Sequence, residues 1–120
     1  MIIAMWVING LLAVVFVAAG AVKIVTPAEA LRARGMTWVE EYKPATVRVI
    51  GAAEVLGAVG LIVPRLISIA PILTPIAALC LAATMAGAVA THVRRQEPYA
   101  PALVLGAACL ASALLGFVAH

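Results

Sequence analysis

Long stretches of apolar residues alternate with short segments that hold nearly all the charges of the chain. A helix that crosses the hydrocarbon core of a bilayer needs about 20 mostly apolar residues. The four apolar stretches that meet or approach this length are residues 2–22, 46–63, 70–93 and 101–118. The pattern therefore predicts an all-α, integral membrane four-helix bundle, with residues 1–120 forming a single transmembrane domain.

The overall composition strengthens this prediction. Hydrophobic residues make up 66% of the chain and charged residues only 11%, whereas soluble domains have roughly 45–50% apolar and about 25% charged residues. A domain of this size has too large a surface to bury so much apolar material inside itself. The lipid bilayer is therefore the expected environment, and a disordered chain is excluded because disordered chains are poor in aliphatic residues.

The first apolar stretch is interpreted as a retained helix and not as a signal peptide. Residues Ala18-Ala19-Gly20 are similar to a signal-peptide cleavage site. However, a signal peptide begins with a basic region, and residues 1–5 hold no Lys or Arg. The stretch is also long enough to span the bilayer.

The segment between the first two spans, residues 26–44, is expected to contain two short helices. Thr26-Pro27-Ala28-Glu29 has the order of an N-cap, a first-turn proline and a capping-box glutamate, and Gly35 is a favourable residue just after a helix end. Thr37-Trp38-Val39-Glu40 repeats the capping box, and Pro44 is expected to end the second turn. Both helices are expected to lie in the membrane interface, with the aromatic side chains at headgroup level: Trp38 and Tyr42.

The distribution of basic residues predicts the orientation of the chain. One side receives seven of them, Lys23, Arg32, Arg34, Lys43, Arg48, Arg94 and Arg95, and the other side receives only Arg65. Because Lys and Arg are enriched in cytoplasmic loops, residues 23–45 and 93–100 are expected to be cytoplasmic. Both termini are then expected to lie outside.

The remaining composition argues against several kinds of site. The net charge of +3 comes from scattered residues and not from the dense basic stripe of a nucleic-acid-binding protein, so anionic lipid headgroups are the expected partners. The two cysteines, Cys80 and Cys109, lie inside apolar stretches without a CxxC or Cys/His spacing. We therefore expect no metal site, and free thiols that pack between helices.

Glu54 is the residue that most strongly suggests a polar site. It lies within the second apolar stretch, where a carboxylate costs roughly 2.5–3.5 kcal/mol on insertion scales. Candidate partners across the bundle are Lys23 and His92, at the ends of the first and third spans. Arg48 is also a candidate, although a separation of six residues puts it about 240° around the helix and ~9 Å along it.

Three interpretations of this polar cluster remain open. The first is a structural clasp that sets the register of the helices. The second is a site for a ligand or quinone head, and the third is part of a proton or substrate pathway. A haem held by two histidines is not expected, because the second histidine, His120, lies at the opposite side. Helix packing is expected at small residues of the second span, namely Gly51, Gly57 and Gly60.

Three sequence segments together resemble the DoxX-like family. The first, Gly20-Ala-Val-Lys23, closes the first span, and the second runs from Arg48 through Gly51, Glu54, Gly57 and Gly60 to Pro64. The third ends the third span at Met85-Ala-Gly-Ala-Val-Ala-Thr-His92. The resemblance implies a four-span bacterial membrane protein of the inner membrane, and it carries family positions onto Lys23, Arg48, Gly51, Glu54, Gly57, Gly60, Pro64 and His92.

The resemblance also implies a role in membrane redox chemistry. Some relatives are membrane subunits of quinone-linked sulfur oxidation, and others are linked to thiol-redox and oxidative-stress complexes. This chain has no soluble redox domain and no redox cysteine motif, so an independent enzyme is not expected. We expect a membrane subunit or scaffold that binds a lipid-like or quinone-like ligand or a partner protein within a redox complex. A quinone-linked oxidoreductase subunit and a small transporter are the alternatives, and a homo-oligomer is left open.

Overall fold

The computed structural model describes residues 2–118, and every regular element in this part of the chain is helical. The elements are α1 (Ile2–Val25), α2 (Ala28–Ala33), the 3₁₀ helix η1 (Thr37–Glu41), α3 (Pro44–Leu66), α4 (Leu73–Arg94) and α5 (Ala100–Val118). Four of them, α1, α3, α4 and α5, are long and apolar enough to cross a membrane. The predicted all-α membrane bundle is therefore confirmed.

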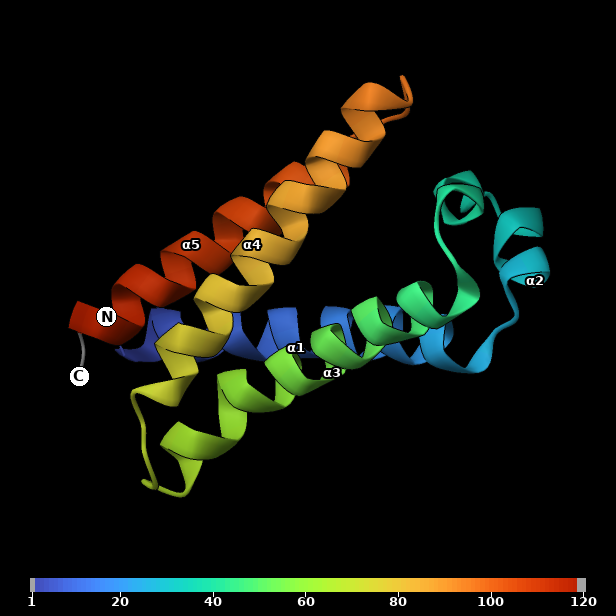
Figure 1. Ribbon diagram of the computed structural model, residues 1–120. Coiled ribbons are helices and arrows are strands. Elements are labelled where there is room, and N and C mark those ends of the chain that lie inside the picture. Colours follow the sequence, from blue (N-terminus) through green and yellow to red (C-terminus); the bar gives the residue numbers. More distant parts are fainter. Residues whose placement is uncertain (1, 119–120) are drawn as a thin grey trace.

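The four long helices are arranged as two pairs (Figure 1). Helix α1 packs along α3, and α4 packs along α5, while contacts between α3 and α4 join the pairs. In the view of Figure 1 the pairs diverge toward the end of the molecule where α2 and η1 lie, and the described chain ends lie at the opposite end. The short helices thus sit over the opening between the two pairs.

Glycines determine how closely the helices approach. A Cβ atom added to Gly51 of α3 would lie 2.6 Å from the carbonyl oxygen of Gly20 in α1, so the two backbones are in direct contact. The other two glycines predicted to be packing sites face α4: Gly57 lies against Leu81, and Gly60 lies against Ala77. Contact between backbones at small residues is a common way for helices to associate in lipid, where no hydrophobic effect drives them together.

A buried polar contact ties three helices together in the half of the bundle away from η1. The amide nitrogen of Asn9 in α1 donates to the carbonyl oxygen of Leu61 in α3 at 3.0 Å. The hydroxyl of Ser112 in α5 donates to the amide oxygen of Asn9. Around these groups the apolar core is filled by residues such as Phe16 and Leu81. Because each polar group finds a partner, burial of Asn9 and Ser112 is tolerated in an apolar interior.

The segment between α1 and α3 forms two short helices, as predicted, but its caps differ from the prediction. Helix α2 ends in a Schellman motif, in which Met36 donates to Leu31, Gly35 donates to Arg32, and Gly35 has a φ of 95°. Both capping boxes are wrong. Helix α2 starts one residue later than expected, with Pro27 as its N-cap and no side-chain cap bond.

The second capping box fails because its threonine has a different partner. Met36 is the N-cap of η1, and the Thr37 hydroxyl donates to Glu97, 60 residues away, at 2.6 Å. A charge-assisted bond to a carboxylate is stronger than a bond to a backbone amide. Pro44 also differs from the expectation, because it starts α3 at its first turn and does not end the preceding turn.

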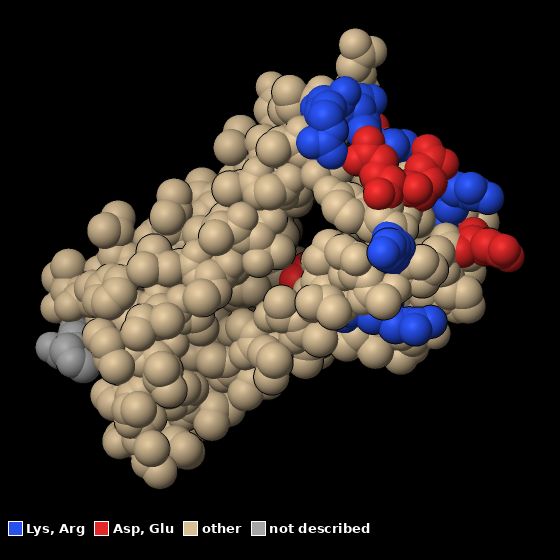
Figure 2. Space-filling model, in the orientation of Figure 1, with Lys and Arg blue, Asp and Glu red and all other residues tan. Residues whose placement is uncertain are grey.

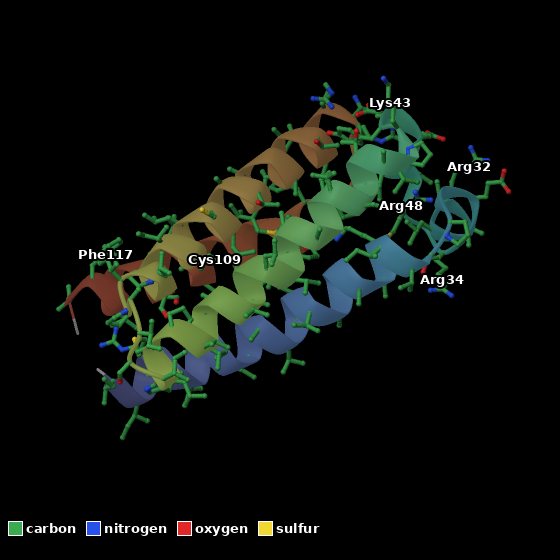
Figure 3. The ribbon with its side chains drawn as sticks, turned by 60° about the horizontal axis from the view of Figure 1, so that its bottom comes forward. Arg32, Arg34, Lys43, Arg48, Cys109 and Phe117 are labelled. Carbon is green, nitrogen blue, oxygen red and sulfur yellow. The ribbon has the colours of Figure 1, made fainter. Side chains whose placement is uncertain are left out.

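Charged side chains gather at the end of the molecule formed by η1, α2 and the α4–α5 connection (Figure 2). Figure 3 shows Arg32, Arg34, Lys43 and Arg48 at this end and Phe117 at the other. We call it the charged end. The fold thus brings together the basic residues that the sequence assigns to one side of the membrane.

We predict that the charged end faces the cytoplasm. In a background without Cys80 and Cys109, an Arg34→Cys variant should be protected from an impermeant thiol reagent in intact cells. A Ser68→Cys variant, in the exposed α3–α4 connection, should be labelled. The positive-inside rule supplies the reason. Labelling of position 34 with protection of position 68 would invert the topology.

We predict that Gly51→Ala destabilises the bundle. The added methyl group would meet the backbone of Gly20, which cannot rotate away, so α1 and α3 must separate at a cost of about 1–3 kcal/mol. Gly10→Ala in α1 is the matched control because its Cβ would meet open space, and in a helix this change is worth up to about 1 kcal/mol in the stabilising direction. Unfolding of both variants in one detergent checks this, and equal stabilities would contradict it.

Candidate functional site

A cavity of about 270 Å³ lies where the two helix pairs diverge. We call it the head pocket. Its walls come from α1, α3, α4 and η1, and it is lined by Lys23, Trp38, Tyr42, Ile50, Glu54, Ala83, Thr84, Met85, Gly87, Ala88, Thr91 and His92. Figure 2 shows the hollow between the two pairs near the charged end. Polar groups from four separate segments therefore converge on one mainly apolar chamber.

An ion pair between α1 and α3 forms the polar side of the head pocket. The ammonium Nζ of Lys23 lies 2.7 Å from Oε1 of Glu54, and the Glu54 residue is only 1% exposed. Lys23 lies in the last turn of α1 and Glu54 near the middle of α3. The contact between Gly20 and Gly51, each three residues before a member of the pair, brings the two side chains into range.

Two aromatic side chains from the segment before α3 form the side of the pocket nearest the charged end. Trp38 lies in η1, and its ring centroid is 5.9 Å from the ammonium of Lys23, which is within the range of a cation–π contact. The ring of Tyr42 packs edge-on against Trp38, with centroids 5.8 Å apart. The Tyr42 hydroxyl lies 2.9 Å from the Thr91 hydroxyl, which also donates to the carbonyl oxygen of Gly87. Trp38 and Tyr42 are thus anchored to both α1 and α4.

Glu97, in the α4–α5 connection, bonds to residues at the side of the pocket nearest to this connection. Its Oε1 lies 3.1 Å from Nδ1 of His92, and its Oε2 accepts from Thr37 and from Nε of Arg95. Hydrogen bonds lower the pKa of the Glu97 carboxyl to about 2. The bond from Thr37 has the largest effect, and those from His92 and Arg95 have smaller effects. Arg95 also donates to Glu40, and this bond raises the pKa of its guanidinium group. The carboxylate and the guanidinium therefore stay charged at neutral pH.

Three of the four residues predicted for the polar cluster line this one cavity. Lys23 and Glu54 are paired directly, whereas His92 lines the cavity and bonds to Glu97. Arg48 does not join them: it is exposed at the charged end (Figure 3) and makes no ion pair within residues 2–118. Its position six residues before Glu54 puts it on another face of α3.

Residues 7–116 match the DoxX-like family, which is almost the whole chain. The chain belongs to the DoxX-like family. No curated protein and no solved structure matches the chain. Every residue that lines the head pocket lies within the matched region, so the pocket is built from the part of the chain that identifies this DoxX-like protein.

Several residues of the site are not predicted by any sequence pattern. The amphipathic rings of Trp38 and Tyr42 predict a position at headgroup level, but they do not predict that both rings line the pocket and that Trp38 lies over Lys23. Thr91 and Glu97 belong to no recognisable motif. Glu97 does follow the basic pair Arg94-Arg95, and these residues lie on the same side of the bundle as Glu40 and Glu41. Acidic residues in the segment before α3 and basic residues at the end of α4, on the same side of the membrane, could have indicated that these two segments contact each other.

The chemistry available to this DoxX-like protein is hydrogen bonding, charge and aromatic contact. Among residues 2–118 no group of three or more His, Cys, Asp or Glu side chains is suited to hold a metal. Both cysteines are free and lie outside the pocket lining, with Cys80 exposed and Cys109 buried. The Lys23 ammonium and the His92 ring can offer hydrogen bonds, and Trp38, Tyr42 and Met85 offer apolar and aromatic contact.

We predict a measurable coupling between Lys23 and Glu54. Removing one partner of a buried ion pair costs about 3–5 kcal/mol in soluble proteins, while interhelical polar contacts in a membrane average about 0.6 kcal/mol. Glu54→Gln and Lys23→Gln should each lower the unfolding free energy, and the double variant should lose less than the sum. A double-mutant cycle in one detergent measures this coupling. Strict additivity would show that the two charges do not stabilise each other.

Proposed function

We propose that this DoxX-like protein is a membrane subunit that binds the polar head of a quinone-like or other lipid-like ligand in the head pocket. The observation that carries the proposal is the cavity itself, with a buried ion pair and two aromatic rings on its walls. Small-molecule sites are mainly apolar cavities with a few converging polar groups, and the head pocket has this character.

The size of the head pocket indicates that it would enclose only part of a ligand and not a whole ligand. Cavities that enclose complete drug-sized ligands are about 300–1,000 Å³, and the head pocket, at about 270 Å³, is below that range. A single ring or head group would fit, with an apolar tail left in the lipid or between helices. This division matches a quinone, in which a flat ring is joined to a long hydrocarbon tail.

The polar groups of the pocket also suit a quinone ring. The two ring carbonyls of a quinone accept hydrogen bonds, and Lys23 and His92 are donors on the pocket wall. Trp38 and Tyr42 present aromatic surface to a flat ring. The Lys23–Glu54 pair keeps the ammonium in place, because an unpaired charge would be costly at such a depth.

The same features favour a binding subunit over a transporter or an independent enzyme. A transport pathway would need a chain of polar groups along the whole bundle. Beyond Glu54 the interior is mostly apolar, with residues such as Phe16 and Leu61, and the buried amide of Asn9 there is hydrogen-bonded to neighbouring helices. A quinone-linked oxidoreductase subunit is the alternative that the same pocket would serve, with the redox partner supplied by another protein. We place the protein in the bacterial inner membrane, with its charged end in the cytoplasm.

We predict that a short-chain benzoquinone quenches Trp38 fluorescence saturably. The chain has two tryptophans, so a Trp6→Phe protein in lipid nanodiscs reports on Trp38 alone. In this background Glu54→Gln should weaken the apparent affinity by about tenfold, since a hydrogen bond to a charged group is worth about 1.5–3 kcal/mol. Arg48→Gln is the matched control, because it removes an exposed charge of the same helix outside the pocket.

The form of the quenching curve distinguishes binding from simple partitioning into lipid. Collisions with quinone dissolved in the bilayer give quenching that rises without saturation and does not depend on Glu54. Such a curve, equal in all three proteins, would contradict the proposed quinone site. A lipid tightly retained in native mass spectra of the same samples would then favour a lipid head group as the ligand.

A further inference from the structure

A second cavity, of about 440 Å³, lies at the charged end. Its lining comes from the start of η1, the α4–α5 connection and the first turn of α5, with Thr37, Glu97, Pro98 and Pro101 among its residues. Two side chains, Trp38 and His92, line both this cavity and the head pocket. The two cavities are therefore neighbours that meet at a boundary formed by these two rings.

Glu97 holds both halves of that boundary at once. Its Oε1 contacts the His92 ring, and its Oε2 accepts from Thr37, the residue before Trp38. Arg95 reinforces the same link, because it donates to the backbone oxygen of Thr37 and to Glu97. The carboxylate is thus a positioning residue for Trp38 and His92, although it does not line the head pocket itself.

Val39 of η1 is buried in an apolar cluster with Leu31 and Val47, whereas the polar links from η1 to the end of α4 and the α4–α5 connection are of a kind that opens readily. They are ion pairs and hydrogen bonds between partly exposed groups, such as Arg94–Glu41 and Arg95–Glu40. Exposed ion pairs contribute little stability and are weakened by salt. Helix η1 has only five residues, so its own backbone bonds hold it weakly. The Trp38 side of the boundary is therefore tied to the α4–α5 connection mainly by these polar links.

We propose that the second cavity is an aqueous vestibule and that Glu97 keeps the boundary between this vestibule and the head pocket closed. When Trp38 and His92 move apart, water and protons reach the head pocket from the charged end. Glu54, only 1% exposed, then exchanges protons with the aqueous side. A ligand head in the pocket gains the same access while its tail stays in lipid. The ligand in this scheme rests on the proposed function, whereas the route for water does not.

The test measures access of water-soluble acrylamide to Trp38 in ligand-free protein, so it stays independent of any quinone result. Acrylamide is neutral, and changing a charge does not alter its local concentration. In the Trp6→Phe background, Glu97→Ala should raise the quenching constant of Trp38 several-fold while helix content stays unchanged. Glu29→Ala is the matched control, because Glu29 is an exposed carboxylate of α2 that takes no part in these links.

Two further variants keep the test decisive. Glu97→Gln retains an acceptor for Thr37 and loses the charge that pairs with Arg95, so it should give intermediate quenching. Arg95→Gln removes the reinforcing link from the other side and should also raise access. If Glu97→Ala fails to fold, these two variants carry the test. Quenching constants equal to that of Glu29→Ala in all folded variants would overturn the vestibule.

Discussion

The ion pair between Lys23 and Glu54 constrains how α1 and α3 pack against each other. A carboxylate in the middle of a membrane-spanning helix is costly, and a cation that reaches it from a neighbouring helix offsets this cost. Here the cation comes from the last turn of α1, at 2.7 Å. Forming this contact requires α1 and α3 to pack with one particular register and rotation. The direct contact of Gly20 with Gly51 meets that requirement, because any side chain at either position would push the helices apart.

The cavity follows from the way in which the two helix pairs diverge. Helices α1 and α3 stay together through their glycine contact, and α4 and α5 form the second pair. At the charged end the space between the pairs is bounded by η1 and not by close helix packing (Figure 1). Trp38 and Tyr42 reach across to Lys23 and Thr91. The head pocket thus forms where the two helix pairs diverge and where polar groups of α1, η1, α3 and α4 meet.

The contrast between the two ends of the bundle suits a protein that binds the head of a lipid-like molecule. Away from the charged end, Asn9 bonds to Ser112 and to the carbonyl oxygen of Leu61 in a mostly apolar interior. At the charged end, His92 and Lys23 line a chamber and still have hydrogen-bonding capacity after their known contacts. Membership of the DoxX-like family agrees with this small, four-span architecture.

The local features of the chain can be predicted from its amino-acid sequence. Apolar length predicts four spanning helices, and a glycine after Arg34 predicts the end of α2, because both depend on neighbouring residues alone. Glu54 could also be identified as the residue that needs a partner, from its position in an apolar stretch. The sequence did not choose between Lys23, Arg48 and His92, since that choice depends on the rotation of one helix against another.

The partners of these polar side chains follow from how the helices pack. The tertiary structure pairs Glu54 with Lys23, directs His92 to Glu97 and leaves Arg48 exposed. It also overrides the capping box at Thr37, whose hydroxyl bonds to a carboxylate 60 residues away. A side chain selects the strongest partner that the packed helices bring within reach. The packing is set by backbone contacts such as Gly20 with Gly51, which no local pattern specifies.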